Sequence, residues 1–139
     1  MLLKGIKGRR TKEYKTKRKN NLMDIEKLRE ICLAKKGVTE EFPFDADTLV
    51  FKVGGKMFSL VSINDPDSCL LKCDPQRAVE LREEHHQIKE GYHMNKKHWN
   101  SVYFEGNMPD SLFIELIDHS YDLVFKGLTK SAKEQVGNM

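Results

Sequence analysis

Apolar residues recur at helical spacing in two segments, one near residue 25 and one near the C-terminal end of the chain. The first segment begins after Asp24, a good N-cap, and places Ile25, Leu28, Ile31 and Cys32 on one face. The second spans residues 110–128, where we expect Asp110 to act as N-cap and a glycine at position 127 to end the helix. Its apolar stripe consists of Leu112, Phe113, Leu116, Ile117, Tyr121, Val124 and Leu128. A further helical turn is predicted over residues 129–135.

The segments between these helices have the pattern of strands. Residues 49–62 read LVFKV and KMFSLV on either side of Gly54-Gly55, whose positive φ values suit a two-residue hairpin turn. Residues 68–73 predict a third strand, Asp74-Pro75 opens a short helix, and residues 87–94 and 97–104 predict two more strands. Short turns join the strands, so the class is α+β: an antiparallel sheet with N- and C-terminal helices packed on one face. We expect residues 23–139 to form a single domain.

The distribution of charge changes near residue 23, where the predicted domain begins. Residues 1–22 hold nine Lys or Arg and one Glu, a net charge of +8, so the remaining residues, with 15 basic and 20 acidic side chains, carry −5. With no amphipathic period, residues 1–22 are predicted to be a disordered basic extension. Two interpretations stay open: a nucleic-acid-binding arm, or a solubilising or non-native extension, with Met23 as the true start.

Acidic residues surround an extended apolar stretch after the first helix. Glu40, Glu41, Asp45 and Asp47 lie around residues 42–44, which read Phe-Pro-Phe. Four carboxylates are chemically able to bind a hard cation, but the mid-loop glycine and closing glutamate of a calcium loop are missing. We therefore expect a solvated acidic loop, with metal binding kept as a variant.

The three cysteines do not have the spacing of a disulfide framework or a zinc site. Cys69 and Cys73 lie in one predicted strand, which would place their Cα atoms roughly 13 Å apart, whereas a disulfide needs less than about 7 Å. With Cys32 they are predicted to be reduced, buried thiols of a cytoplasmic protein. No metal or other cofactor is expected.

The richest stretch for chemistry is residues 91–104, GYHMNKKHWNSVYF. Strand alternation places Trp99 and Tyr103 on one face. Beside Lys96 and Lys97 they suggest a cationic and aromatic platform, in which lysines meet phosphates and an exposed ring stacks on a base. The alternative is that the tryptophan packs against a helix and the lysines keep the strand end soluble. The candidate nucleic-acid-binding residues are Asn95, Lys96, Lys97, His98, Trp99 and Tyr103.

The chain resembles the MmcQ/YjbR family over residues 23 to about 128. The resemblance is carried by MDIEKLREICLAKKGVTEEFPFD, GGKMF, LLKCDP, GYHMNKKHWNSVYF and SLFIELIDHSYDLVFKGL. Its most specific part is the cluster Met94, Asn95, Lys96 and Trp99, followed by Ser120, Tyr121, Leu123 and Val124. The resemblance implies a frataxin-like α+β fold and a DNA-binding role that rests on a double-wing arrangement of strands.

From these observations we predict a non-enzymatic, monomeric domain whose partner is DNA. No glycine-rich phosphate loop precedes a helix, and no nucleophile lies in a strand–turn–helix elbow. No apolar run approaches the roughly 18 residues of a membrane span, so no membrane partner is expected. The alternative is a module that binds an unidentified protein or small ligand on a frataxin-like scaffold, by the sheet face near Trp99 and the acidic loop from Glu40 to Asp47.

Overall fold

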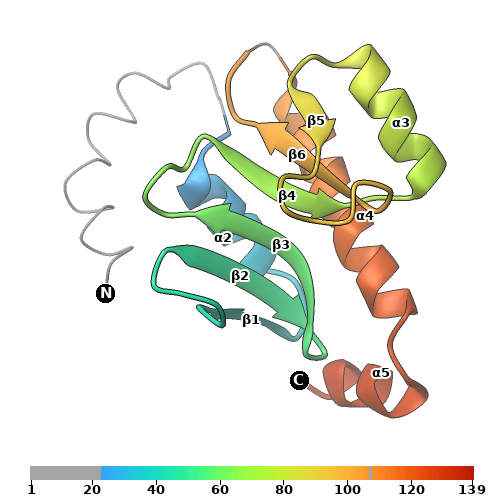
Figure 1. Ribbon diagram of the computed structural model, residues 1–139. Coiled ribbons are helices and arrows are strands. Elements are labelled where there is room, and N and C mark those ends of the chain that lie inside the picture. The colour runs from blue at the N-terminus through green and yellow to red at the C-terminus, as the bar shows by residue number, and fades with distance from the viewer. Residues whose placement is uncertain (1–22, 107) are drawn as a thin grey trace.

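The computed structural model describes residues 23–106 and 108–139, and the extension predicted for residues 1–22 lies outside them. Six strands form one antiparallel sheet in the order β1-β2-β3-β4-β6-β5, which confirms the α+β class. The strands are β1 (Val38–Glu41), β2 (Thr48–Val53), β3 (Lys56–Ser62), β4 (Ser68–Lys72), β5 (Ile88–Glu90) and β6 (Trp99–Tyr103). Figure 1 shows α2 and α4 behind this sheet, covering one face. We call the opposite face the outer face.

The helices are α2 (Ile25–Leu33), α3 (Pro75–Glu84), α4 (Asp110–Lys126) and α5 (Lys130–Gly137). The side chains of Asp24 and Asp74 accept hydrogen bonds from backbone N–H groups in the first turns of α2 and α3, as N-caps do. Gly127 ends α4 as predicted, but Asp110 is not its N-cap. Pro109 holds that position without a side-chain hydrogen bond, and Asp110 is the first helical residue. None of the helices among the described residues is long and apolar enough to cross a membrane.

Part of the predicted acidic loop is a strand. Residues 38–41 form β1, an edge strand that pairs with β2 through backbone hydrogen bonds. Glu40 forms an ion pair with Arg29 at 2.6 Å, and Glu41 forms one with Lys52 at 3.2 Å. Both carboxylates therefore have basic partners within the fold.

The same segment bears on the metal-binding variant. The carboxylate of Asp45 accepts hydrogen bonds from the backbone N–H groups of Asp47 and Thr48, at 2.9 and 2.7 Å, so it shapes a turn. Across residues 23–106 and 108–139 there is no group of three or more His, Cys, Asp or Glu side chains able to hold a metal ion. Glu40, Glu41 and Asp45 thus have partners within the fold, and metal binding by the acidic residues stays a prediction.

The sheet separates two apolar clusters of very different size. The main core lies between the sheet and the helices and includes Leu28, Phe51, Phe58, Phe113 and Ile117, each at most 2% exposed. A small second cluster lies on the outer face. Its members are the buried Val50, Leu60 and Trp99, with the partly buried Met57, Leu70 and Met94.

Strands β3 and β4 separate before they end. Their last paired residues are Ser59 and Leu71, and Figure 1 shows the two strands diverging beyond that point. The hydroxyl of Ser120, from α4, bridges the opening. It accepts a hydrogen bond from the backbone N–H of Lys72 at 2.8 Å and donates one to the carbonyl of Phe58 at 2.6 Å. A side chain from the helix thus replaces a rung of the ladder.

Candidate functional site

Residues 95–98 form a tight turn before β6, which we call the basic loop. The side chain of Asn95 accepts a hydrogen bond from the N–H of Lys97 at 2.9 Å. The backbone carbonyl of Asn95 accepts hydrogen bonds from the N–H groups of His98 and Trp99, at 3.1 and 3.0 Å. Lys96 and Lys97 are exposed, and neither has an acidic partner within the part of the chain that the structure describes. The basic loop therefore exposes two lysine side chains on a backbone turn that is fixed by hydrogen bonds.

The basic loop also forms hydrogen bonds with neighbouring elements. The carbonyl of His98 accepts a hydrogen bond from the N–H of Cys73, just after β4, at 2.8 Å. From α3, the guanidinium of Arg82 donates to the side chain of Asn100 at 2.7 Å and to the carbonyl of Lys96 at 3.4 Å. The basic loop is therefore fixed to both β4 and α3.

The side chain of Trp99 is buried, which contradicts one of the two interpretations made from the sequence. It is only 7% exposed, so the expectation of an exposed stacking ring is wrong. It also does not pack into the main core, because it lies on the outer face with Val50 and Leu60. Its burial there supports the sheet and places the ring at the border of the outer-face cluster.

Tyr103 shares the outer face with Trp99 but lies at the other end of β6. Four residues separate them, which is roughly 13 Å along a strand, and Tyr103 pairs with Ser68 rather than approaching the basic loop. The exposed aromatic residue beside the loop is Tyr92, which is 72% exposed and whose ring lies 3.9 Å from that of His93. The structure thus brings the lysines together and leaves Tyr103 apart.

Beside the basic loop, the separation of β3 and β4 leaves an open notch of about 340 Å³. Two lysines line it, Lys56 from the start of β3 and Lys72 from the end of β4. The remaining lining residues are Met57, Trp99, Leu123, Val124 and Gly127. We call this space the notch. The sequence pattern does not predict this space, and its one signal is a lysine at the end of an apolar strand.

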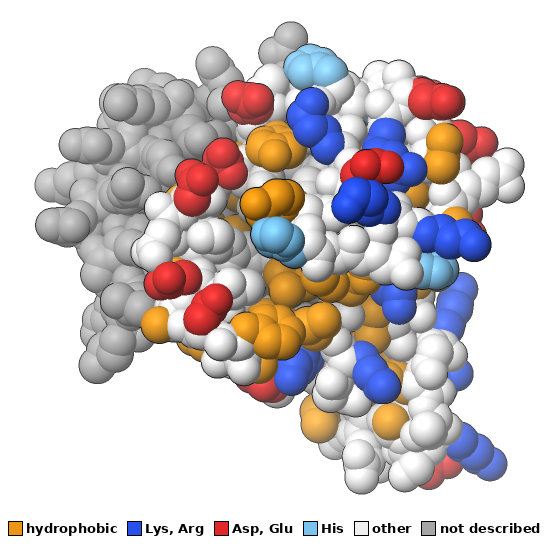
Figure 2. All heavy atoms as spheres, in the orientation of Figure 1, with side chains coloured by type: hydrophobic (Ala, Val, Ile, Leu, Met, Phe, Trp, Pro, Cys, Tyr) orange, Lys and Arg blue, Asp and Glu red, His pale blue; other side chains and the backbone are white. Residues whose placement is uncertain are grey.

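Figure 2 shows the outer face in the orientation of Figure 1. Hydrophobic side chains gather in the middle of this face, and Lys and Arg side chains lie to their right. The surface is hollowed beside the hydrophobic centre, where the sheet meets the end of α4. Apolar surface and positive charge are therefore adjacent on this face, although residues 23–139 carry a net negative charge.

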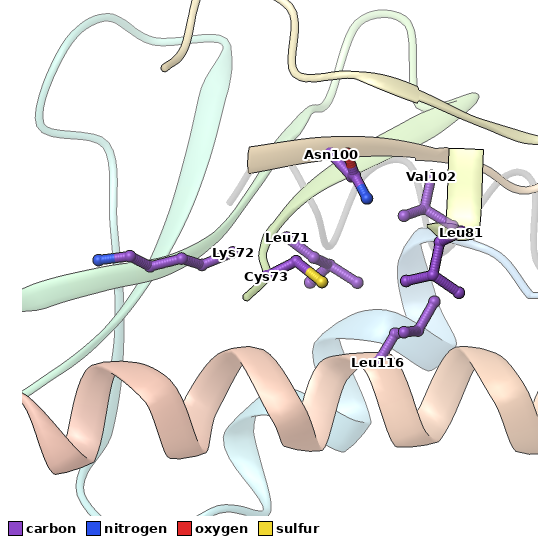
Figure 3. Close-up of a pocket in the computed structure, with 7 residues that line it drawn as sticks. All are labelled: Leu71, Lys72, Cys73, Leu81, Asn100, Val102 and Leu116. Carbon is purple, nitrogen blue, oxygen red and sulfur yellow. The ribbon is translucent and has the colours of Figure 1, made fainter. Parts of the chain in front are cut away.

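A second space is much smaller and enclosed by apolar side chains. It measures about 10 Å³ and lies between β4, β6, α3 and α4. Figure 3 shows Leu81, Val102 and Leu116 around it, the sulfur of Cys73 directed toward it and the side chain of Lys72 extending away. Its volume is about that of one water molecule, too small for an organic ligand.

All three cysteines are free and buried, as predicted. Burial raises the pKa of Cys32 to about 12 and that of Cys73 to about 11, and it raises the pKa of Cys69 well above its usual value. Since the thiolate is the nucleophile, these thiols are unreactive near neutral pH. Their positions are explained by packing.

Comparison with known proteins identifies relatives that match about two thirds of the chain. The YjbR family model matches residues 33–123. The uncharacterised protein YbdF of Escherichia coli O157:H7 is 42% identical over 96 residues, covering 68% of this chain and 79% of YbdF. YjbR of Escherichia coli K12, also uncharacterised, is 34% identical over 100 residues, covering 71% of this chain and 85% of YjbR.

Two solved structures are also similar to this chain. The crystal structure of Deinococcus radiodurans protein DR2400 has a TM-score of 0.77 and 42% sequence identity, covering 84% of this chain and 89% of that one. A protein from Pseudomonas syringae, 23% identical with a TM-score of 0.63, shares the fold over 73% of this chain and 99% of its own. The segment matched by the family model includes both the basic loop and most of the notch. The chain therefore belongs to the YjbR family.

Proposed function

We propose that this protein is a non-enzymatic DNA-binding domain that contacts the phosphate backbone through Lys96 and Lys97. The observation that carries the proposal is the hydrogen-bonded turn of the basic loop, which holds two exposed lysines that have no acidic partner among the described residues. Binding therefore breaks no ion pair and fixes little additional backbone. Both features favour a phosphate contact, because the free energy of such contacts comes mainly from release of counterions by Lys and Arg.

The non-enzymatic part of the proposal is supported by the chemistry of the buried nucleophiles. The pKa of Cys32 is about 12, so its thiolate is negligible at neutral pH. The Nε2 atom of His119 accepts a hydrogen bond from the N–H of Asp74 at 3.2 Å, so it is occupied in a structural contact. Neither group is placed for transfer of a proton or an acyl group.

The test is fluorescence anisotropy of labelled duplex and single-stranded DNA with the full chain, measured across a salt series. We compare the natural sequence with the double variant Lys96→Ala and Lys97→Ala. The matched control is Lys130→Ala with Lys133→Ala on α5, which removes the same charge elsewhere. Both sets keep residues 1–22, so any contribution from that basic segment is common to all samples.

Loss of two phosphate contacts should weaken binding and lower the slope of log K against log salt by about 1.8 for duplex DNA. The control should change affinity only through net charge and should keep the larger slope. Equal affinity and equal slope for the two double variants would contradict a role for the basic loop, and DNA binding would then have to be assigned to other cations.

A further inference from the structure

We propose that the notch is a binding site for a small organic anion with an apolar body, held by Lys56 and Lys72. This inference is separate from DNA binding by the basic loop, since the two sites use different lysines. The shared chemistry of the ligand is one carboxylate or phosphate monoester on a hydrocarbon body. A volume of about 340 Å³ lies in the range of roughly 300 to 1,000 Å³ found for small-molecule sites.

The two lysines supply the first argument. Among the described residues, Lys27, Arg29, Lys35, Lys52 and Arg77 form ion pairs with acidic side chains, but the ion pairs include neither lysine of the notch. Lys72 is half-buried, and its backbone rather than its ammonium group contacts Ser120. A partly desolvated cation without a carboxylate partner is favourably paired by an anionic ligand.

The apolar lining supplies the second argument. Lys72 lies directly opposite Trp99 in the β4–β6 register, so both side chains are on the outer face. Leu123 and Val124 come from α4 and reach the notch because β3 and β4 have separated. In this open space an aliphatic or aromatic body therefore lies between the tryptophan ring and the helix, while its charged end meets the ammonium groups.

The backbone that surrounds the notch is fixed. The tip of the β2–β3 hairpin contacts the chain just beyond α4, since a Cβ atom on Gly54 would lie 2.6 Å from Leu128. The hydroxyl of Ser120 holds the other end of the opening. The notch is thus a preformed space, and a ligand need not order a loop in order to bind.

The experiment uses the full chain and three probes with the same hydrocarbon body: octanoate, octyl phosphate and the neutral octanamide. Trp99 is the only tryptophan and lines the notch, so its fluorescence reports occupancy, and calorimetry gives the stoichiometry. We expect saturable binding of one anion per chain, with octanamide weaker by about tenfold, the usual loss for one charge-assisted hydrogen bond. Tight binding by only one of the two anions would identify the head group as carboxylate or phosphate.

Variants locate the site. Lys72→Met and Lys56→Met should each weaken anion binding by about tenfold while leaving octanamide unchanged. Lys56 is exposed on the hairpin, so its substitution keeps the test valid if the other variant is unstable. Lys96→Met and Lys130→Met should leave the affinity unaltered. The proposal is overturned if neither anion binds, if octanamide binds as tightly as the anions, or if Lys56→Met and Lys72→Met bind the anions as the natural sequence does.

Discussion

Replacing Ser120 with alanine removes the bridge between β3 and β4. The residue is fully buried, and its hydroxyl makes two short hydrogen bonds, at 2.8 Å with the N–H of Lys72 and at 2.6 Å with the carbonyl of Phe58. Because the ladder has already ended at Ser59 and Leu71, no backbone group is placed to replace the hydroxyl. Alanine therefore leaves one donor and one acceptor unpaired.

The size of the effect follows from these two groups. Leaving a buried backbone donor or acceptor unpaired costs about 1–3 kcal/mol. Relaxation of the surrounding backbone offsets part of this cost, so we expect a total loss of about 2–4 kcal/mol in the free energy of unfolding. For a domain of this length, that lowers the melting temperature by roughly 8–16 °C.

Ser59→Ala is the matched control, because Ser59 is also fully buried and lies one residue from the bridged carbonyl. Among the described residues, its hydroxyl makes no hydrogen bond of ordinary geometry, and it meets the thiol of Cys32, a weak partner. Removing it should change the free energy of unfolding by less than about 1 kcal/mol. The assay is urea unfolding followed by circular dichroism at constant pH.

The difference in stability between Ser120→Ala and Ser59→Ala tests whether the Ser120 hydroxyl holds β3 and β4 together. If Ser120→Ala loses no more stability than Ser59→Ala, with equal m-values, the bridge does not hold the strands and the reasoning is refuted. Hydrogen exchange gives a local measure of the same interaction. The amide of Lys72 should lose protection in Ser120→Ala and keep it in Ser59→Ala.

Two further predictions concern the hairpin and the pH dependence of stability. Gly54→Ala should lower the free energy of unfolding by about 2–3 kcal/mol, because φ is +58° and the new Cβ atom would lie 2.6 Å from the Leu128 side chain. Gly55→Ala should lower it by only about 1 kcal/mol, because φ is +81° but the space around the new Cβ atom is free. Equal urea midpoints for the two variants would contradict the contact between Gly54 and Leu128. Burial lowers the pKa of His119, whose Nε2 accepts from Asp74, so the unfolded chain binds more protons and stability falls as pH drops below about 6.5. Urea midpoints from pH 8 to pH 5 should fall more for the natural sequence than for His119→Gln, and parallel curves would contradict the contact.

Elements with local signals were predictable from the sequence. The N-caps Asp24 and Asp74 and the turn at Gly54-Gly55 act within a few residues, and each appears in the structure as expected. Strand β1 was missed because it has a single strongly apolar residue, Val38, and its stability comes from backbone pairing with β2. Acidic residues on an edge strand also suit a position that must not pair with another chain.

The candidate site was predictable only in part. The sequence grouped Asn95, Lys96 and Lys97 as candidate residues but began a strand at Lys97, whereas residues 95–98 form a turn and β6 begins at Trp99. Alternation also placed Trp99 and Tyr103 on one face, but it gives no information about which residues of other strands cover that face. Burial of the tryptophan depends on Val50 and Leu60, far away in sequence, and the frataxin-like comparison stays a prediction.

The notch was not predictable, because it arises from the relation between three distant segments. It requires that the β3–β4 ladder stop at Ser59 and Leu71, that Ser120 reach across from α4, and that Leu123 follow one turn later. In sequence, a serine within an apolar helical stripe has many explanations. Only the geometry shows that it keeps two strands apart.

A structural role and a ligand-binding role of Lys72 predict opposite effects of Lys72→Met on stability and anion affinity. On the outer face its neighbours include Leu70 and Trp99, so an apolar residue at position 72 would extend the second cluster. If the lysine serves an anion, Lys72→Met should unfold at an equal or higher urea concentration while losing anion affinity, because burying apolar surface adds about 25 cal/mol per Å². A clear loss of stability in Lys72→Met, with unchanged anion binding, would instead make the lysine part of the scaffold.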